Sequence, residues 1–176
     1  MDIDESVREG EEPIEYVRRL AVEKARAFDA RLGDIVIAAD TTIDLDGEIL
    51  AKPDDDADAR RMLTALSGRR HLVHTGLAVR DGDRIVADVE TSGVSMASIT
   101  DTMMDWYIAT GEALDKAGGY AIQEAGAMLV GAVDGSVTNV IGLPLTLLDR
   151  LLDDVGVSLA SLLLHTPRAK TVARRD

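Results

Sequence analysis

Asp40 and Lys52 are the first residues whose types and spacing could do chemistry. Asp40 follows the mostly apolar run 34–39, which Gly33 bounds and which predicts a short buried strand. Open α/β folds place ligands at the carboxyl ends of such strands. Lys52 precedes Pro53, which restricts it to an extended conformation that could direct its amine toward Asp40. Such a pair could act on an anionic substrate, although a turn-forming aspartate and a solvated lysine are the structural alternatives.

Two other segments gather polar side chains that a purely structural role does not require. The chain opens with Asp2-Ile3-Asp4-Glu5, whose carboxylates could hold a divalent cation, although acids near a terminus are commonly just solvated. Residues 115–123 contain Gly118-Gly119, which let a backbone approach a ligand closely. The same segment ends at Gln123, whose amide offers both a donor and an acceptor.

Composition narrows the classes of function. The 176 residues include 32 acids and 19 bases, and the net charge of −13 would repel a nucleic-acid backbone. Cysteine is absent, so any metal site would be rich in oxygen. His71 and His74, placed on the same side of a predicted strand, lack a third ligand nearby and are more typical of polar strand residues. Without an apolar run of roughly 20 residues or a signal peptide, we predict a cytoplasmic protein that binds neither nucleic acid nor membrane.

The elements that must position these residues follow from apolar periodicity and turn signals. The strand 34–39 is predicted to be buried on both faces, and Asp40 follows its carboxyl end. Hairpins are predicted around Asp46-Gly47 and around residues 81–83, with a helix over 54–66 between them. The first helix begins at Pro13 and places these apolar residues on one face: Ile14, Val17, Leu20, Ala21, Ala25 and Phe28.

The second half of the chain continues the alternation. A helix capped by Thr100 or Asp101 ends at Gly111, strands are predicted over 118–123 and 125–133, and a helix covers 145–152. We predict an α/β domain with a mixed sheet over residues 1–157, and a C-terminal helix turn and basic tail over 158–176. The tail carries Leu162-Leu163-Leu164 and the bases Arg168, Lys170, Arg174 and Arg175.

Seven blocks, taken in order, resemble the Maf family of nucleoside triphosphate pyrophosphatases. Each block is weak alone, but their order over roughly residues 2–152 makes chance agreement a poor explanation. The matching residues are Asp2-Ile3-Asp4-Glu5; Tyr16-Val17, Leu20-Ala21 and Lys24-Ala25; Ala39-Asp40-Thr41; Lys52-Pro53; Leu66-Ser67-Gly68 with His71 and Thr75-Gly76; Asp115-Lys116-Ala117-Gly118 through Gln123; and Asn139-Val140-Ile141-Gly142-Leu143-Pro144.

The resemblance implies a fold and a reaction. The fold is similar to that of inosine triphosphate pyrophosphatases, with a twisted mixed sheet, flanking helices and two lobes around a cleft. The reaction is metal-dependent hydrolysis of a nucleoside triphosphate to the monophosphate and pyrophosphate. By this resemblance Asp40 is the proton acceptor, and Glu5, Lys24 and Lys52 share its polar site. Glu5 and Asp40 would position Mg²⁺ or Mn²⁺, while the two lysines would hold the triphosphate as point charges.

The resemblance extends to the substrate and to assembly. Thr41 and Gln123 look like the branch that acts on dTTP and UTP, and Lys116 is a further substrate-binding residue. The Gln123 amide could pair with the edge of a pyrimidine and penalise a mismatched base. The family commonly forms dimers, and the apolar residues 162–164 would allow a homodimer here.

One departure from the family pattern keeps alternatives open. Family members carry a strand and a Ser-rich loop containing Pro-Arg-Arg ahead of the Asp-Ile-Asp-Glu block, whereas this chain starts at Met1. We therefore expect an unpaired sheet edge and an uncovered core face. The alternatives are a non-catalytic nucleotide-binding or division-regulating protein, and a poorly folded fragment of a longer reading frame.

Overall fold

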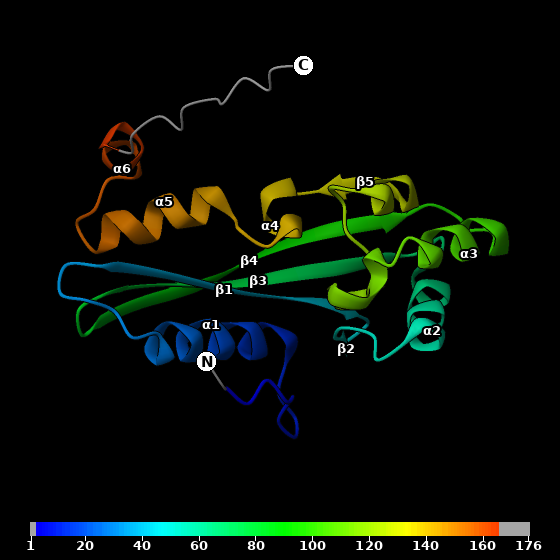
Figure 1. Ribbon diagram of the computed structural model, residues 1–176, viewed down its shortest axis with the longest axis horizontal. Helices are drawn as coiled ribbons and strands as arrows, with labels where there is room; N and C mark the ends of the chain where they lie inside the picture. Colours follow the sequence, from blue (N-terminus) through cyan, green and yellow to red (C-terminus); the bar gives the residue numbers. More distant parts are fainter. Residues whose placement is uncertain (1–2, 166–176) are drawn as a thin grey trace, which may run out of the picture.

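A five-stranded antiparallel sheet with helices on both faces forms the core of the protein, and the computed structural model describes residues 3–165 (Figure 1). In spatial order the strands are β2 (Glu48–Leu50), β1 (Ile35–Leu45), β3 (Arg70–Asp81), β4 (Arg84–Met96) and β5 (Val130–Asp134). The prediction of an α/β sheet with flanking helices is confirmed. All pairing among the described strands is antiparallel, and not mixed as we predicted.

The helices form two layers and an end cap. Helix α1 (Pro13–Ala27) covers one face of the sheet, and α4 (Val137–Ile141) and α5 (Leu145–Asp154) cover the other. Helices α2 (Asp56–Leu66) and α3 (Asp101–Ala109) close one end, together with the 3₁₀ helices η1 (Glu112–Asp115), η2 (Ala117–Gly119) and η3 (Ala125–Leu129). Helix α6 (Leu159–His165) follows α5.

Local signals predicted the hairpins and the main helices correctly. Asp46 and Gly47 both have positive φ, 57° and 90°, as the two-residue turn between β1 and β2 requires. The side chains of Asp55 and Thr100 accept hydrogen bonds from the first turns of α2 and α3. The turn and the cap at Thr100 depend on neighbouring residues only, which is why the sequence predicts them, whereas Asp55 was not singled out as a cap.

The prediction that a strand ends at Asp40 is wrong. Strand β1 continues to Leu45 and stays paired with β3 through Asp44 and Leu72, so Asp40 lies in the middle of the strand. Ile37 is 42% exposed, so the strand is not covered on both faces either. Among the described residues β2 pairs only with residues 43–45 of β1, which leaves residues 35–42 as a sheet edge. Asp40 lies on this edge stretch of β1.

Two other segments also differ from the predictions. Ile14 and Phe28 are about half exposed, whereas Tyr16 joins Val17 and Leu20 in the buried face of α1. Phe28 lies beyond the end of the helix, so the periodicity no longer applies to it. Residues 118–123 do not form a strand, because Gly118 and Gly119, both with positive φ, end the 3₁₀ helix η2 and a turn at residues 122–123 follows. Of the predicted strand 125–133 only residues 130–133 are extended, as part of β5, since residues 125–129 form η3.

The C-terminal segment is described only in part. Helix α6 lies within the segment 158–176, and the Leu164 side chain is exposed. The side chains of Leu162 and Leu163, and the basic residues Arg168, Lys170, Arg174 and Arg175, lie outside the described residues. None of the helices in residues 3–165 has the length and apolar character needed to cross a membrane.

The two histidines of β3 face opposite sides of the sheet, so their predicted common side is wrong. Side chains alternate along a strand, and an odd spacing of three residues separates His71 from His74. His71 Nε2 lies 2.7 Å from the hydroxyl of Tyr120, while His74 Nδ1 lies 2.8 Å from the hydroxyl of Thr91. Both imidazoles therefore serve as buried polar partners within the core.

Burial of His71 predicts a pH dependence of stability. Burial lowers the pKa of His71 from 6.5 to about 4, with a smaller contribution from Arg70. Between these values the unfolded chain binds the proton more readily, so stability is lost as the pH falls from 6.5 toward 4, by about 3 kcal/mol at most. The variant His71→Gln should show a flatter profile when unfolding free energies are measured by urea titration across this range. An unchanged slope in the variant would contradict the assignment.

Candidate active site

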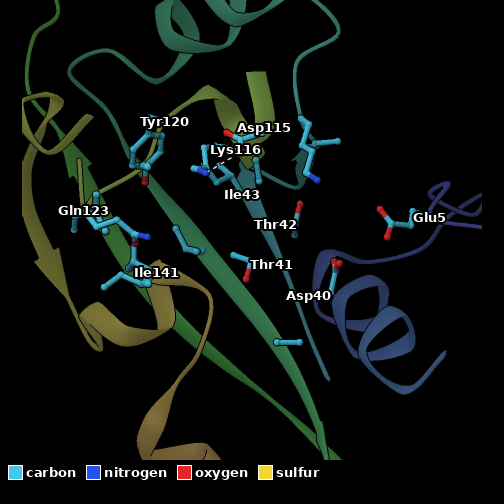
Figure 2. A pocket seen from close by; sticks show the side chains of 18 of the residues that line it. Glu5, Asp40, Thr41, Thr42, Ile43, Asp115, Lys116, Tyr120, Gln123 and Ile141 are labelled. Atoms are coloured by element: carbon cyan, nitrogen blue, oxygen red, sulfur yellow. Dashed lines mark hydrogen bonds and ion pairs between the residues drawn. The ribbon is translucent and has the colours of Figure 1, made fainter. Parts of the chain in front are cut away.

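A pocket of about 440 Å³ lies against the open stretch of β1. Its walls come from the N-terminal arm (residues 3–12), α1, β1, the segment after β2, residues 115–123 and α4. Figure 2 shows Glu5 and Asp40 toward one end, Gln123 and Ile141 at the other, and Thr41 between them. A pocket of this volume fits a nucleotide-sized ligand.

Three charged groups meet at the first end of this pocket. Lys24 Nζ lies 2.5 Å from Asp40 Oδ1 and 2.9 Å from Glu5 Oε1. Lys24 comes from α1, Asp40 from the middle of β1 and Glu5 from the arm, so three separate segments build the cluster. The structure thus brings together three of the predicted site residues.

Burial changes the proton affinity of Asp40 in this cluster. The Asp40 side chain is 12% exposed, and burial raises its pKa even though the hydrogen bond and charge of Lys24 act in the opposite direction. For Lys24, burial acts to lower the pKa, but Asp40 and Glu5 outweigh it and leave the pKa raised. Asp40 is therefore a more basic carboxylate than usual, next to a lysine that stays charged.

Thr41 points to the opposite face of the sheet from Asp40 and is held there by a buried chain of hydrogen bonds. Its hydroxyl lies 2.9 Å from that of Thr75, and the Thr75 hydroxyl donates to the carbonyl of Asn139 at 2.9 Å. The Asn139 amide donates in turn to Val73 O and to the hydroxyl of Ser92. Thr41 is thus fixed by α4 and the central strands.

The remaining predicted residues line the same pocket at different positions. Lys52 has no hydrogen bond or ion pair with any described residue, although its charge acts on Asp40. Lys116 pairs with Asp115 at 2.9 Å. The exposed amide of Gln123 has no hydrogen-bond partner among residues 3–165 and is free for a ligand.

Tyr16 is a site residue to which the sequence assigned no role. It lines the pocket, and its hydroxyl donates to the carbonyl of Glu5 at 2.9 Å. Its position beside Val17 at the start of α1 hinted at the buried face, but only the contact with the arm shows its place in the site. Ile43 and Val140 add apolar walls in the same way.

Among the described residues, the carboxylates of Glu5 and Asp40 are the candidates for holding a metal ion. No group of three or more His, Asp or Glu side chains gathers to hold an ion in residues 3–165. Glu5 and Asp40 both contact the same ammonium group, so the cation that they share in this structure is Lys24. Asp4 instead accepts hydrogen bonds from Ser6, and Asp2 lies outside the described residues.

The fold and the pocket define an α/β protein with a polar pocket that three acids and three lysines line. The chain belongs to the Maf family, whose profile, described as "Maf-like protein", matches residues 1–155. It is 52% identical over 163 residues to a protein of Anaeromyxobacter dehalogenans strain 2CP-C, covering 90% of this chain and 82% of the relative. It is 44% identical over 164 residues to a protein of Chromobacterium violaceum, covering 90% and 83%. Both relatives are named dTTP/UTP pyrophosphatase.

Proposed function

We propose that this protein hydrolyses dTTP and UTP to the nucleoside monophosphate and pyrophosphate. The observation that carries the proposal is the cluster of Asp40, Lys24 and Glu5 at one end of a nucleotide-sized pocket. The names of the relatives and the membership in the Maf family support the same activity.

In the proposed reaction a water molecule attacks the α-phosphorus of the nucleotide. Asp40 accepts the proton of that water, the bond between the α-phosphorus and the bridging oxygen breaks, and pyrophosphate leaves. Lys24, Lys52 and Lys116 hold the phosphate oxygens and offset the charge that develops on them. Burial raises the pKa of Asp40 and so makes its carboxylate a stronger base, while the charge of Lys24 opposes this effect and favours the ionised carboxylate. Lys24 itself stays charged and can also bind a phosphate oxygen.

The charge balance of the pocket supports a requirement for Mg²⁺ or Mn²⁺. Its charged lining residues are the acids Glu5, Asp40 and Asp115 and the bases Lys24, Lys52 and Lys116. These charges cancel, so a triphosphate would bring an uncompensated negative charge into the site. Glu5 and Asp40 offer the hard oxygen ligands that such ions prefer. A bound ion would neutralise charge on the phosphate oxygens.

The far end of the pocket is suited to the base and the sugar. The unpaired amide of Gln123 can donate to and accept from the edge of a pyrimidine, next to the apolar surface of Ile141. Thr41, fixed through Thr75, occupies the middle of the pocket and restricts what fits between base and phosphates.

A homodimer and a cytoplasmic location remain predictions from the sequence.

Pyrophosphate release from a panel of nucleotides tests the proposed function. The protein would be incubated with dTTP, UTP, CTP, GTP or 7-methyl-GTP, with Mg²⁺, with Mn²⁺, or with a chelator. We expect equal amounts of monophosphate and pyrophosphate from dTTP and UTP, and no products with the chelator.

Two results would contradict the proposal. One is release of orthophosphate alone, which would mean attack at the terminal phosphorus. The other is thermal stabilisation by dTTP without any release, which would instead indicate a non-catalytic nucleotide-binding protein.

A further inference from the structure

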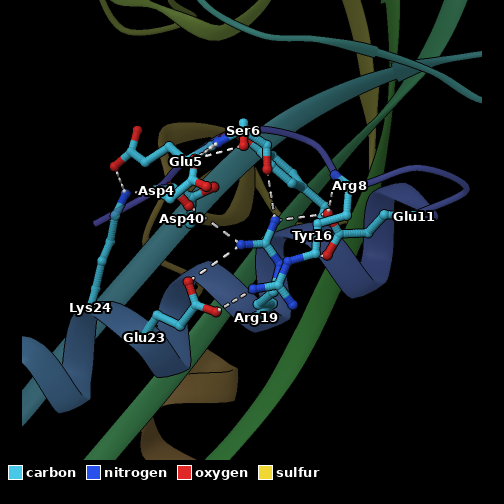
Figure 3. A network of polar contacts seen from close by, with 10 residues as sticks. All are labelled: Asp4, Glu5, Ser6, Arg8, Glu11, Tyr16, Arg19, Glu23, Lys24 and Asp40. Carbon is cyan, nitrogen blue, oxygen red and sulfur yellow. Dashed lines mark hydrogen bonds and ion pairs between the residues drawn. The ribbon is translucent and has the colours of Figure 1, made fainter. Parts of the chain in front are cut away.

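The arm that carries Glu5 has little secondary structure of its own. Residues 3–12 form neither helix nor strand, and their one backbone hydrogen bond within the arm joins Glu11 N–H to Arg8 O. Side-chain contacts must therefore fix the position of the Glu5 carboxylate, because free loop residues lose about 1–2 kcal/mol of conformational entropy each when ordered. Apart from hydrogen bonds that the side chains of Asp4 and Glu11 accept within the arm, these contacts come from one face of α1, as Figure 3 shows.

Arg19 of α1 uses all five of its N–H donors on this arm and on a neighbouring glutamate. Nε and Nη2 bind the two carboxylate oxygens of Glu11 at 2.6 and 2.7 Å, and Nη1 binds Glu23 at 3.3 Å. The remaining donors reach the carbonyls of Ser6 at 3.0 Å and of Asp4 at 3.5 Å. A guanidinium alone among side chains offers five donors in a fixed plane.

The contacts of Arg19 surround Glu5 in the sequence. Arg19 holds the carbonyls on both sides of Glu5, and Tyr16, three residues earlier on α1, holds the carbonyl of Glu5 itself. The Arg19 guanidinium also lies over the Tyr16 ring, 5.6 Å from its centroid. Three consecutive carbonyls are therefore anchored to one helix face, and the Glu5 side chain extends from this anchored stretch to Lys24.

The central ion pair of this anchor is sheltered from solvent. The side chains of Arg19 and Glu11 are 12% and 9% exposed, whereas Arg8, on the surface of the same arm, is 64% exposed. The hydrogen bond from Arg19 lowers the pKa of Glu11 to about 2 against a smaller opposing effect of burial. The pair thus stays ionised at every pH at which an enzyme of this kind would work.

From these contacts we infer that Arg19 is a positioning residue, which orders the N-terminal arm and thereby places the Glu5 carboxylate beside Lys24 and Asp40. Arg19 does not line the pocket and acts only through Glu5. This inference rests on the proposed function for its effect on turnover, but the ordering of the arm can be measured without catalysis.

A double-mutant cycle tests the coupling between the two residues. Arg19→Lys keeps the charge but loses the planar fork, so kcat/KM for dTTP should fall about tenfold in the parent protein. In a Glu5→Gln background the same change should cost less than about twofold, because the carboxylate that Arg19 positions is gone. An equal loss in both backgrounds would mean that Arg19 supports the fold in general, and would overturn the inference.

Hydrogen exchange provides the second readout and a matched control. In Arg19→Lys the amides of Ser6, Arg8 and Glu11 should exchange faster while those of β3 and β4 keep their protection. Arg8→Gln removes an exposed ion pair of the same arm and should leave both exchange and turnover within about twofold of the parent. Unchanged exchange of the arm in Arg19→Lys would overturn the inference. If the parent protein releases no pyrophosphate, the proposed function fails, while the exchange result still decides whether Arg19 orders the arm.

Discussion

Replacement of Asp40 by asparagine is expected to lower kcat for pyrophosphate release by about 10³-fold, since a positioned general base contributes roughly 10²–10⁴-fold. Asparagine has nearly the same shape and can still accept a hydrogen bond from Lys24, but it cannot take a proton from water. Lys24 also keeps its contact with Glu5, so the cluster should not collapse. Steady-state kinetics with dTTP, together with thermal unfolding of the variant, measures both effects.

The control for this variant is an aspartate of the same sheet outside the pocket. Asp88 of β4 pairs with Arg150 at the surface at 2.5 Å, and Asp88→Asn should change kcat by less than about twofold. The parent should also lose activity as the pH falls through the raised pKa of Asp40, because the base must be ionised. If Asp40→Asn retains the turnover of the parent, Asp40 is not the proton acceptor.

Replacement of Gly76 by alanine is expected to destabilise the protein by about 3 kcal/mol or more, the upper range for overpacking of a core. A Cβ atom at Gly76 would lie 2.2 Å from the carbonyl oxygen of Val17 and 2.8 Å from Arg18 N, both in the backbone of α1. Backbone atoms within a helix cannot move aside singly, so the whole helix must shift. Urea denaturation measures the change in unfolding free energy.

The same substitution should impair the site as well as the fold. Gly76 is the direct partner of Asp40 in the pairing of β1 with β3, and the close approach of α1 at this point brings Lys24 to Asp40. A shift of α1 away from the sheet would lengthen that contact. We therefore expect kcat/KM for dTTP to fall even at temperatures where the variant is fully folded, by about tenfold or more.

A second glycine of the sheet provides the control. A Cβ atom at Gly93 of β4 would also approach within 2.2 Å of another atom, but that atom belongs to the guanidinium of Arg70. The Arg70 side chain is 54% exposed and can turn into solvent, so Gly93→Ala should cost less than about 1 kcal/mol. Equal unfolding free energies for the Gly76 and Gly93 variants would show that the contact with α1 is not rigid.

The sequence by itself determined the features that arise from neighbouring residues. The turn at Asp46-Gly47, the cap at Thr100 and the helix α2 depend on local hydrogen bonds and on helical periodicity. The ordered blocks also identified the family, and the structure gathers Asp40, Lys24 and Glu5 in one place as that resemblance implies.

Only the tertiary structure decided how far β1 extends and what holds the site together. The polar residues 40–42 look like the end of a strand in the sequence, yet pairing with β3 carries the strand through them and leaves them at an open edge. Likewise, the donors of Arg19 reach partners up to fifteen residues away, and no local pattern specifies them. These hydrogen bonds form only when the packing of α1 on the sheet brings distant segments of the chain together. The strength of each bond depends on the distance between donor and acceptor, and local backbone geometry does not fix that distance.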